Sequence, residues 1–187
     1  MRLVVFAHGM EGSPQGTKAT FLRQVLEATS PWLGELGLAD QVDALADAIG
    51  DRGPAVVVGS SLGGLAALGL ATSRPELIAH LVLLAPAVGM AHRAELRPEV
   101  EQLRPGLFDE SIEFSGLAVP EGLPATILHG LEDDVILLSD VLQLAQRSPS
   151  SRLILVHDDH PLHGSRDLIL ALVRRAAEGR DPLPGGP

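Results

Sequence analysis

The sequence predicts an α/β fold, with a doubly wound, mainly parallel sheet of about five to six strands and helices on both faces. Two observations lead to this prediction. Five short segments are apolar almost without interruption, which is typical of parallel strands that are buried on both faces. Segments with helical spacing of apolar residues alternate with them, as expected of strands joined by right-handed crossovers.

Each expected strand is a brief run rich in β-branched residues or leucine, followed by residues that break such a run. The expected strands are Leu3–Ala7, Ala55–Gly59, His80–Ala85, Ala125–His129 and Arg152–His157.

Helices are expected between these strands, where apolar residues recur every three or four positions. They are marked by Phe21, Leu22, Val25 and Leu26; by Val42, Leu45, Ala46 and Ile49, ending near Gly50; by the Ala- and Leu-rich stretch 62–72; by Val141, Leu142 and Ala145; and by Leu168, Leu172 and Val173, with Gly179 as the cap.

Two regions depart from this alternation. Residues 87–122 contain many charges and three prolines between two expected strands, which is too long for a plain connection. We expect an excursion or small cap there, with one or two short helices. The tail at about 181–187 is expected to be loose. The rest of residues 1–187 is predicted to be a single domain.

Composition limits the partners of the chain. It has 187 residues, 45% of them hydrophobic, which suits one globular domain with a sizeable core. The net charge is −10 and Lys18 is the one lysine, so no basic stripe favours nucleic acid. No apolar stretch reaches the roughly 18 residues of a membrane span. Without cysteine, a cytoplasmic location is predicted; a homodimer is left open.

The segment Gly59-Ser60-Ser61-Leu62-Gly63 matches G-x-S-x-G. It follows a strand-like run and opens a helix-like run, the context in which the central serine stands exposed on a strained turn between strand and helix. The free N–H groups of the helix terminus suit a developing oxyanion. Ser61 is therefore the predicted nucleophile and Ser60 a small spacer. The alternative is a glycine-rich turn without chemistry, as in phosphate-binding folds.

A nucleophilic serine needs a base and a group that orients the base, in the chain order Ser, then Asp or Glu, then His. Three acids follow the fourth expected strand, and any of them could be a solvated turn residue: Glu132, Asp133 and Asp134. Three histidines follow the fifth: His157, His160 and His163. A loop position a few residues beyond the strand reaches back best, which favours His160.

Four segments of the sequence together carry a family resemblance: HGMEGSPQGTKATFL (8–22), GSSLGG (59–64), LHGLEDDVI (128–136) and DDHPLHG (158–164). They resemble the corresponding segments of short, nearly capless serine esterases of the α/β-hydrolase superfamily. The resemblance implies a minimal α/β-hydrolase fold, with Asp133 as the acid and His160 as the base. It also implies that the N–H groups of Met10 and Leu62 form the oxyanion hole. His8 and Gly9 shape that loop, with His8 as a structural residue.

The sequence departs from these esterases between the first two expected helices, where they carry an edge strand. The span Ser30–Ala39 has no β-branched residue, so this strand is predicted to be missing or degenerate. Trp32 could lie in an exposed patch or in the core, and the core is the prediction.

The excursion leaves the sheet at the end where the nucleophile is expected. Some of its apolar residues could form a wall for an acyl chain, although most of them suit ordinary packing: Leu96, Leu103, Leu107, Phe108, Phe114 and Leu117. Because the excursion is small, a small ester or thioester is favoured over a long triglyceride.

The predicted function is that of a serine hydrolase acting on a small carboxylic ester or thioester through an acyl-enzyme, with no cofactor. Thioester, C–C or perhydrolytic cleavage would use the same triad. The alternative is a catalytically silent fold that binds a small molecule or a protein. His157, Asp158, Asp159, His160 and His163 resemble metal ligands by type, but the triad explains this loop better, so no metal is expected.

Overall fold

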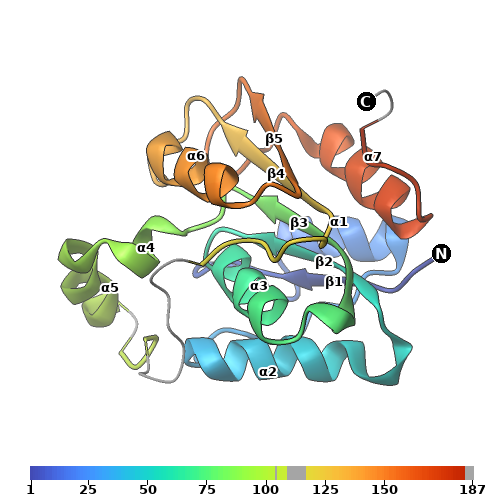
Figure 1. The fold of residues 1–187 in the computed structure, drawn as a ribbon. Helices are drawn as coiled ribbons and strands as arrows, with labels where there is room; N and C mark the ends of the chain where they lie inside the picture. The colour runs from blue at the N-terminus through green and yellow to red at the C-terminus, as the bar shows by residue number, and fades with distance from the viewer. Residues whose placement is uncertain (104, 109–116, 184–187) are drawn as a thin grey trace.

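The computed structural model describes residues 1–103, 105–108 and 117–183. Its sheet has five parallel strands in the order β1-β2-β3-β4-β5 (Figure 1). They are β1 (Val4–Ala7), β2 (Ala55–Ser60), β3 (Ile78–Leu84), β4 (Ala125–Gly130) and β5 (Ser151–Val156). The predicted parallel sheet is confirmed.

Helices lie on both faces of this sheet, as predicted. The α-helices are α1 (Thr17–Leu26), α2 (Leu38–Ile49), α3 (Leu62–Ser73), α4 (Gly89–His92), α5 (Arg97–Leu103), α6 (Leu138–Arg147) and α7 (Arg166–Ala177). Three short 3-10 turns accompany them: η1 (Gly50–Arg52), η2 (Pro75–Leu77) and η3 (Ala94–Leu96). One core cluster joins one face of the sheet to α2, α3 and α6, and a second joins the other face to α1 and α7.

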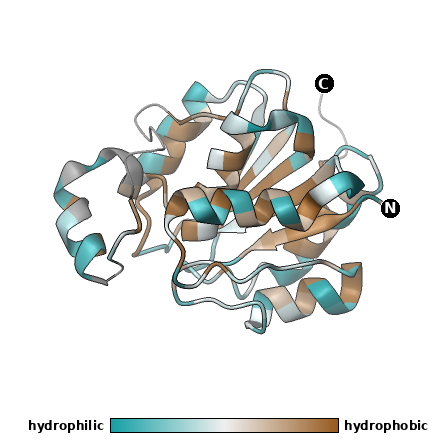
Figure 2. Ribbon diagram, turned by 90° about the horizontal axis from the view of Figure 1, so that it is seen from below, coloured by the Kyte–Doolittle hydropathy of each residue, from teal (hydrophilic) through white to brown (hydrophobic). Residues whose placement is uncertain are grey.

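Alternation along the strands explains the two clusters. Val57 of β2 lies in the first and its neighbours Val56 and Val58 lie in the second, because successive side chains of a strand point to opposite faces. Both faces are covered, so β1, β2 and β4 are buried throughout, and β3 is buried at every residue except Ala79. Figure 2 shows the apolar strands between helices whose outer sides are polar.

Helix boundaries follow local signals closely. Gly179, the predicted cap of α7, has φ of +72°, and its N–H donates to the carbonyl of Ala176 at 3.0 Å. The next N–H, of Arg180, donates to the carbonyl of Arg175 at 2.8 Å, which completes a glycine cap of the Schellman type.

β3 starts two residues before the predicted His80, because Ile78 already pairs with Ala55 of β2.

The edge beside β1 has a single isolated bridge in the described chain, between Val5 and Thr29. Phe6 N–H donates to Thr29 O at 2.8 Å and Thr29 N–H donates to Val4 O at 2.9 Å. The predicted degeneracy of this edge strand is confirmed.

The prediction that Trp32 lies in the core is wrong, since its side chain is 54% exposed and packs beside His8 with ring centroids 6.0 Å apart.

The segment between β3 and β4 contains α4, η3 and α5, which lie together at one end of the molecule (Figure 1). Arg93 anchors it to α6 by donating to the buried Asp140 Oδ2 at 2.7 Å. Leu107 and Leu117 are buried in the first core cluster and Phe108 packs against it, so these three residues serve packing. Leu96 is half-buried. Phe114 and the side chain of Leu103 lie outside the described residues.

The end of the predicted loose tail, residues 184–187, also lies outside the described range. Among the helices that the structure describes, none combines the length and the apolar character needed to cross a membrane.

Candidate active site

Ser61 occupies a strained backbone conformation at the junction of β2 and α3. Its φ is +54° and its ψ −121°, a combination that a residue with a side chain rarely adopts. Three hydrogen bonds hold it there. Its N–H donates to Leu84 O at 2.9 Å, and its carbonyl accepts from Gly64 N at 2.9 Å and from Ala87 N at 3.0 Å. The turn therefore presents the hydroxyl above the carboxyl end of the sheet.

Two glycines make this turn possible. A Cβ atom at Gly59 would lie 2.6 Å from the carbonyl oxygen of Gly63, and a Cβ atom at Gly63 would collide with the backbone of Ala7 and His8. Backbone atoms cannot move aside as a flexible side chain can. Both positions therefore need glycine for β1, β2 and α3 to approach one another.

The side chains of Ser61, His160 and Asp133 lie in one line of hydrogen bonds. Nε2 of His160 is 3.2 Å from Ser61 Oγ, and Nδ1 of His160 is 2.8 Å from Asp133 Oδ2. The other carboxylate oxygen, Oδ1, accepts from Val135 N at 2.9 Å and Ile136 N at 2.8 Å. The Asp133 side chain is fully buried, so its negative charge is held in a fixed position beside the imidazole.

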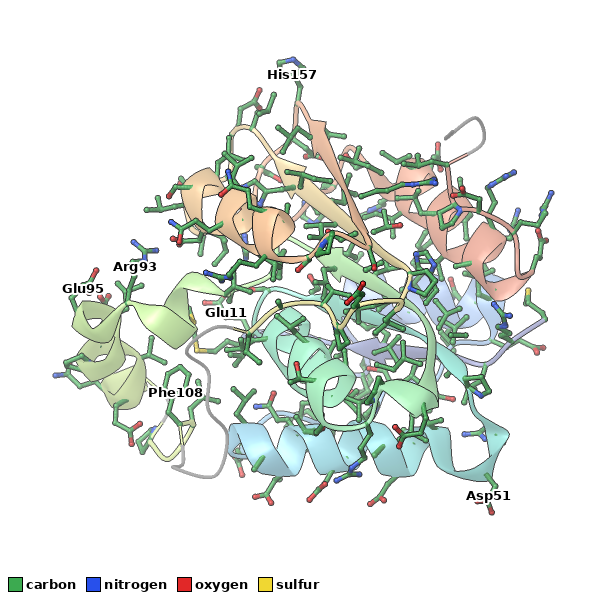
Figure 3. The ribbon with its side chains drawn as sticks, in the orientation of Figure 1. Glu11, Asp51, Arg93, Glu95, Phe108 and His157 are labelled. Carbon is green, nitrogen blue, oxygen red and sulfur yellow. The ribbon has the colours of Figure 1, made fainter. Side chains whose placement is uncertain are left out.

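The competing residues lie elsewhere. His157 is 86% exposed and points away from the sheet at the tip of the molecule (Figure 3). Its nearest acid is Glu132, whose Oε1 atom lies 3.6 Å from His157 Nδ1. Asp134 and His163 are exposed. Of the three acids and three histidines that the sequence offers, the structure brings Asp133 and His160 to Ser61.

Asp158 joins the loop that carries His160 to the loop that carries Asp133. Its carbonyl oxygen accepts from Glu132 N at 3.1 Å, and its carboxylate accepts from the Ser165 hydroxyl at 2.7 Å and from Asp159 N at 3.0 Å. A Cβ at Gly130 would collide with the same carbonyl, so the two loops are in close contact. This contact fixes the approach of His160 to Asp133.

The loop after β1 approaches Ser61 from the other side. A Cβ built on Gly9 would lie 3.1 Å from Ser61 Cβ and 3.6 Å from its Oγ. Within the described residues, the N–H groups of Met10 and Leu62 have no acceptor. His8 fixes this loop, since its buried ring accepts a hydrogen bond from Leu33 N at 3.1 Å. The loop is thus held in place with two backbone donors available near Ser61.

Lys18 lies next to the turn that carries Ser61, and it was not among the site residues predicted from the sequence. Its amine donates to Ser60 Oγ at 3.1 Å. Burial lowers the pKa of Lys18, whereas the nearby carboxylates Asp159, Asp158 and Asp133 counteract that shift. The feature of the sequence that could have drawn attention to Lys18 is that it is the one lysine of the chain.

His129 lies next to Asp133 and was also missed. It is completely buried at the end of β4, with Nδ1 3.7 Å from Asp133 Oδ2, and neither ring nitrogen has a hydrogen-bond partner in the described chain. Burial lowers the pKa of His129; Asp133 counteracts this shift and His160 adds to it. The ring therefore stays neutral near pH 7 and adds no second positive charge beside Asp133.

No group of three or more His, Cys, Asp or Glu side chains within the described ranges has an arrangement that could hold a metal ion. The arrangement around Ser61 instead brings a hydroxyl, an imidazole and a buried carboxylate into one line of hydrogen bonds, with backbone N–H groups nearby.

The chain is similar in sequence to acyl-cleaving enzymes. The human mitochondrial palmitoyl-protein thioesterase ABHD10 is 29% identical over 157 residues, which cover 69% of this chain and 50% of that protein. The chain thus spans about half the length of this relative. Lipase LipV of Mycobacterium tuberculosis is 46% identical over 63 residues, covering 33% of this chain and 24% of that protein. No protein-family model matches the chain.

The fold is also found among solved structures. A protein from Xanthomonas campestris assigned to the hydrolases of the alpha/beta superfamily is 26% identical, with a TM-score of 0.65 over 95% of this chain and 97% of that one. This likeness extends over nearly the whole chain and confirms the predicted α/β-hydrolase fold.

Proposed function

We propose that this chain, which has the α/β-hydrolase fold and resembles α/β hydrolases in sequence, is a serine hydrolase that cleaves a small carboxylic ester or thioester. The hydrogen-bonded line from Ser61 through His160 to Asp133 carries the proposal. Ser61 is the nucleophile, His160 the general base, and Asp133 the group that orients the imidazole.

Acylation begins when Ser61 Oγ attacks the acyl carbon and its proton passes to Nε2 of His160. The carbonyl oxygen becomes an oxyanion, which the N–H groups of Met10 and Leu62 stabilise. Asp133 stabilises the imidazolium through Nδ1–H. The bond from the acyl carbon to the leaving oxygen or sulfur then breaks, and His160 returns the proton to the leaving group, which departs as an alcohol or a thiol.

Deacylation repeats these steps with water. His160 takes a proton from the water molecule as its oxygen attacks the acyl carbon of the ester on Ser61. The same two N–H groups stabilise the second oxyanion, and the bond to Ser61 Oγ breaks as His160 passes the proton it took from water to Oγ. The products are a carboxylic acid and the free serine. One water molecule is consumed, and Ser61 and His160 return to their starting states.

The substrate class rests on the relatives and on the small size of the segment between β3 and β4. One relative is named as a palmitoyl-protein thioesterase and another as a lipase, and both names describe the cleavage of acyl groups. For this chain we propose a small acyl ester or thioester. A cytoplasmic location and a homodimer stay predictions; the human relative is named as mitochondrial.

Labelling with a fluorophosphonate, followed by peptide mapping, tests the proposal. An activated serine attacks this phosphorus electrophile, so we expect the label on Ser61 and its absence in Ser61→Ala. Ser60→Ala is the matched control, because it removes the neighbouring hydroxyl and should keep both the label and most of the activity. Label on Ser60 would overturn the assignment of the nucleophile.

A substrate panel then distinguishes the chemistry of the leaving group. p-Nitrophenyl esters and acyl thioesters of matched short acyl chains should both be hydrolysed by the parent protein and by neither Ser61→Ala nor His160→Ala. A folded parent protein that takes no label and cleaves no member of the panel would overturn the proposal in favour of a catalytically silent binding protein.

A further inference from the structure

A hollow lies at the opposite end of the sheet from Ser61. Its volume is about 320 Å³, and it is walled by residues at the amino ends of β3, β4 and β5 together with the turn that follows α7. The N-terminus lies beside the end of α7 (Figure 1), where Arg2 N–H donates to Ala177 O at 2.8 Å. Because the strands are parallel, this hollow is separated from the proposed active site by the length of the sheet.

The wall of the hollow contains three arginines, which is unusual in a chain with a net charge of −10. They are Arg2, Arg152 and Arg180, and they come from three separate segments of the sequence. Asp181 is the acid of the wall, and it accepts from Arg152 Nη1 at 2.5 Å. Arg180 pairs with Glu178, which is not part of the wall. The wall therefore has more positive than negative groups.

Arg2 is the arginine with its donors unused. Its guanidinium lies over Gly179, where a built Cβ would stand 3.7 Å from Nη2. Its side chain has no hydrogen bond or ion pair with any described residue. A guanidinium carries five N–H donors in a planar fork that matches an oxyanion, so Arg2 can bind one without first breaking another contact.

The floor of the hollow is polar and neutral. His80 is buried there and its Nε2 lies 3.0 Å from Thr126 Oγ1. Burial lowers the pKa of His80 to about 4; Asp181 counteracts this shift, while Arg152 and Arg2 add to it. Ser150 contributes a hydroxyl that accepts from Gly122 N at 3.0 Å and keeps its own proton to donate. The floor can thus donate to an anion without repelling it.

From these contacts we infer that the hollow binds the phosphate group of a small phosphomonoester. A phosphate presents three terminal oxygens that can accept donors from three directions, whereas a carboxylate presents two. Arg2, Arg180 and Ser150 offer donors from three segments. The volume exceeds what one phosphate fills, and the apolar residues Pro124, Ala125 and Ala176 border the remaining space, which suits a small organic group. This inference is independent of the reaction at Ser61.

The test is a titration of the full chain with phenyl phosphate and, separately, with inorganic phosphate, at low and constant ionic strength. Calorimetry gives the affinity, and NMR of histidine-labelled protein locates the ligand by the His80 signal, which is identified by its loss in His80→Gln. We expect saturable binding that shifts the His80 signal. Tighter binding of phenyl phosphate identifies an organic phosphate as the ligand, and equal binding identifies phosphate alone.

Two variants and one control decide whether the arginines are responsible. Arg2→Gln and the double variant Arg2→Gln/Arg180→Gln should weaken phosphate binding, the double variant by about tenfold or more. Arg52→Gln is the matched control, because Arg52 is an exposed arginine outside the hollow. Arg2 has no partner to lose, so Arg2→Gln should keep the parental thermal stability. Unchanged affinity in the double variant, a silent His80 signal, or the same response to chloride would overturn the inference.

Discussion

Nε2 of His160 lies 3.2 Å from Oγ of Ser61 although 99 positions separate the two residues in the chain. The distance is that of a hydrogen bond between a base and the hydroxyl it would deprotonate. It exists because β2 and β5 end at the same edge of the sheet, and because the loop after β5 is held against the loop after β4.

Loss of the base or of the acid should stop the reaction. His160→Ala and Asp133→Asn should each lower kcat/KM for a neutral ester by about 10⁴-fold, because the proton of Ser61 then has no correctly oriented acceptor. The double variant should lose little more than the worse single variant, since these residues act as a unit. Steady-state kinetics on folded variants provides the measurement, and multiplied single effects would argue against one shared mechanism.

The neighbouring histidines supply internal controls. His157→Ala and His163→Ala remove exposed rings that do not contact Ser61, so their kcat/KM should stay close to the parental value. If His163→Ala abolished turnover while His160→Ala retained it, the assignment of the base would be wrong.

Removal of the second backbone donor should slow the chemical step. Met10→Pro has no N–H at the position proposed as the second oxyanion donor, and loss of one such donor costs about 10²–10³-fold in kcat. KM should change little, because the donor acts on the oxyanion rather than on the bound ester. Met10→Ala keeps the N–H and should keep most of kcat. A folded Met10→Pro protein with parental kcat would exclude this donor.

The buried His80 should make the fold sensitive to acid. Its pKa is about 4 in the folded chain against 6.5 for an unperturbed histidine, so the unfolded chain binds more protons between these pH values. Stability should therefore fall as the pH decreases from about 6.5 to about 4, by up to about 3 kcal/mol from this residue. Denaturant unfolding of the parent and of His80→Gln should show that the variant lacks this part of the pH dependence.

His163→Gln is the control for that measurement, because it also removes a histidine but from an exposed position. If the free energy of unfolding depended on pH in the same way for the parent and for His80→Gln, burial would not lower the pKa of His80.

Local patterns in the sequence determined the strands and the turn at Ser61. An apolar run such as Ala55–Ser60 indicates a strand that is covered by helices on both faces. The G-x-S-x-G motif needs small residues because strand and helix meet at that turn. The absence of β-branched residues after Ser30 likewise indicated the degenerate edge, because that segment has little strand propensity.

Tertiary structure decided what depends on the path of loops and on contacts between distant segments. His157, His160 and His163 are equivalent as residue types, and the contact of Asp158 with Glu132 is what directs the second of them to Asp133. Trp32 looks like a core residue by type, yet the chain around the β1 edge leaves it exposed. The arginines around the hollow at the amino ends of the strands come from three separate segments, and no local pattern could place them together.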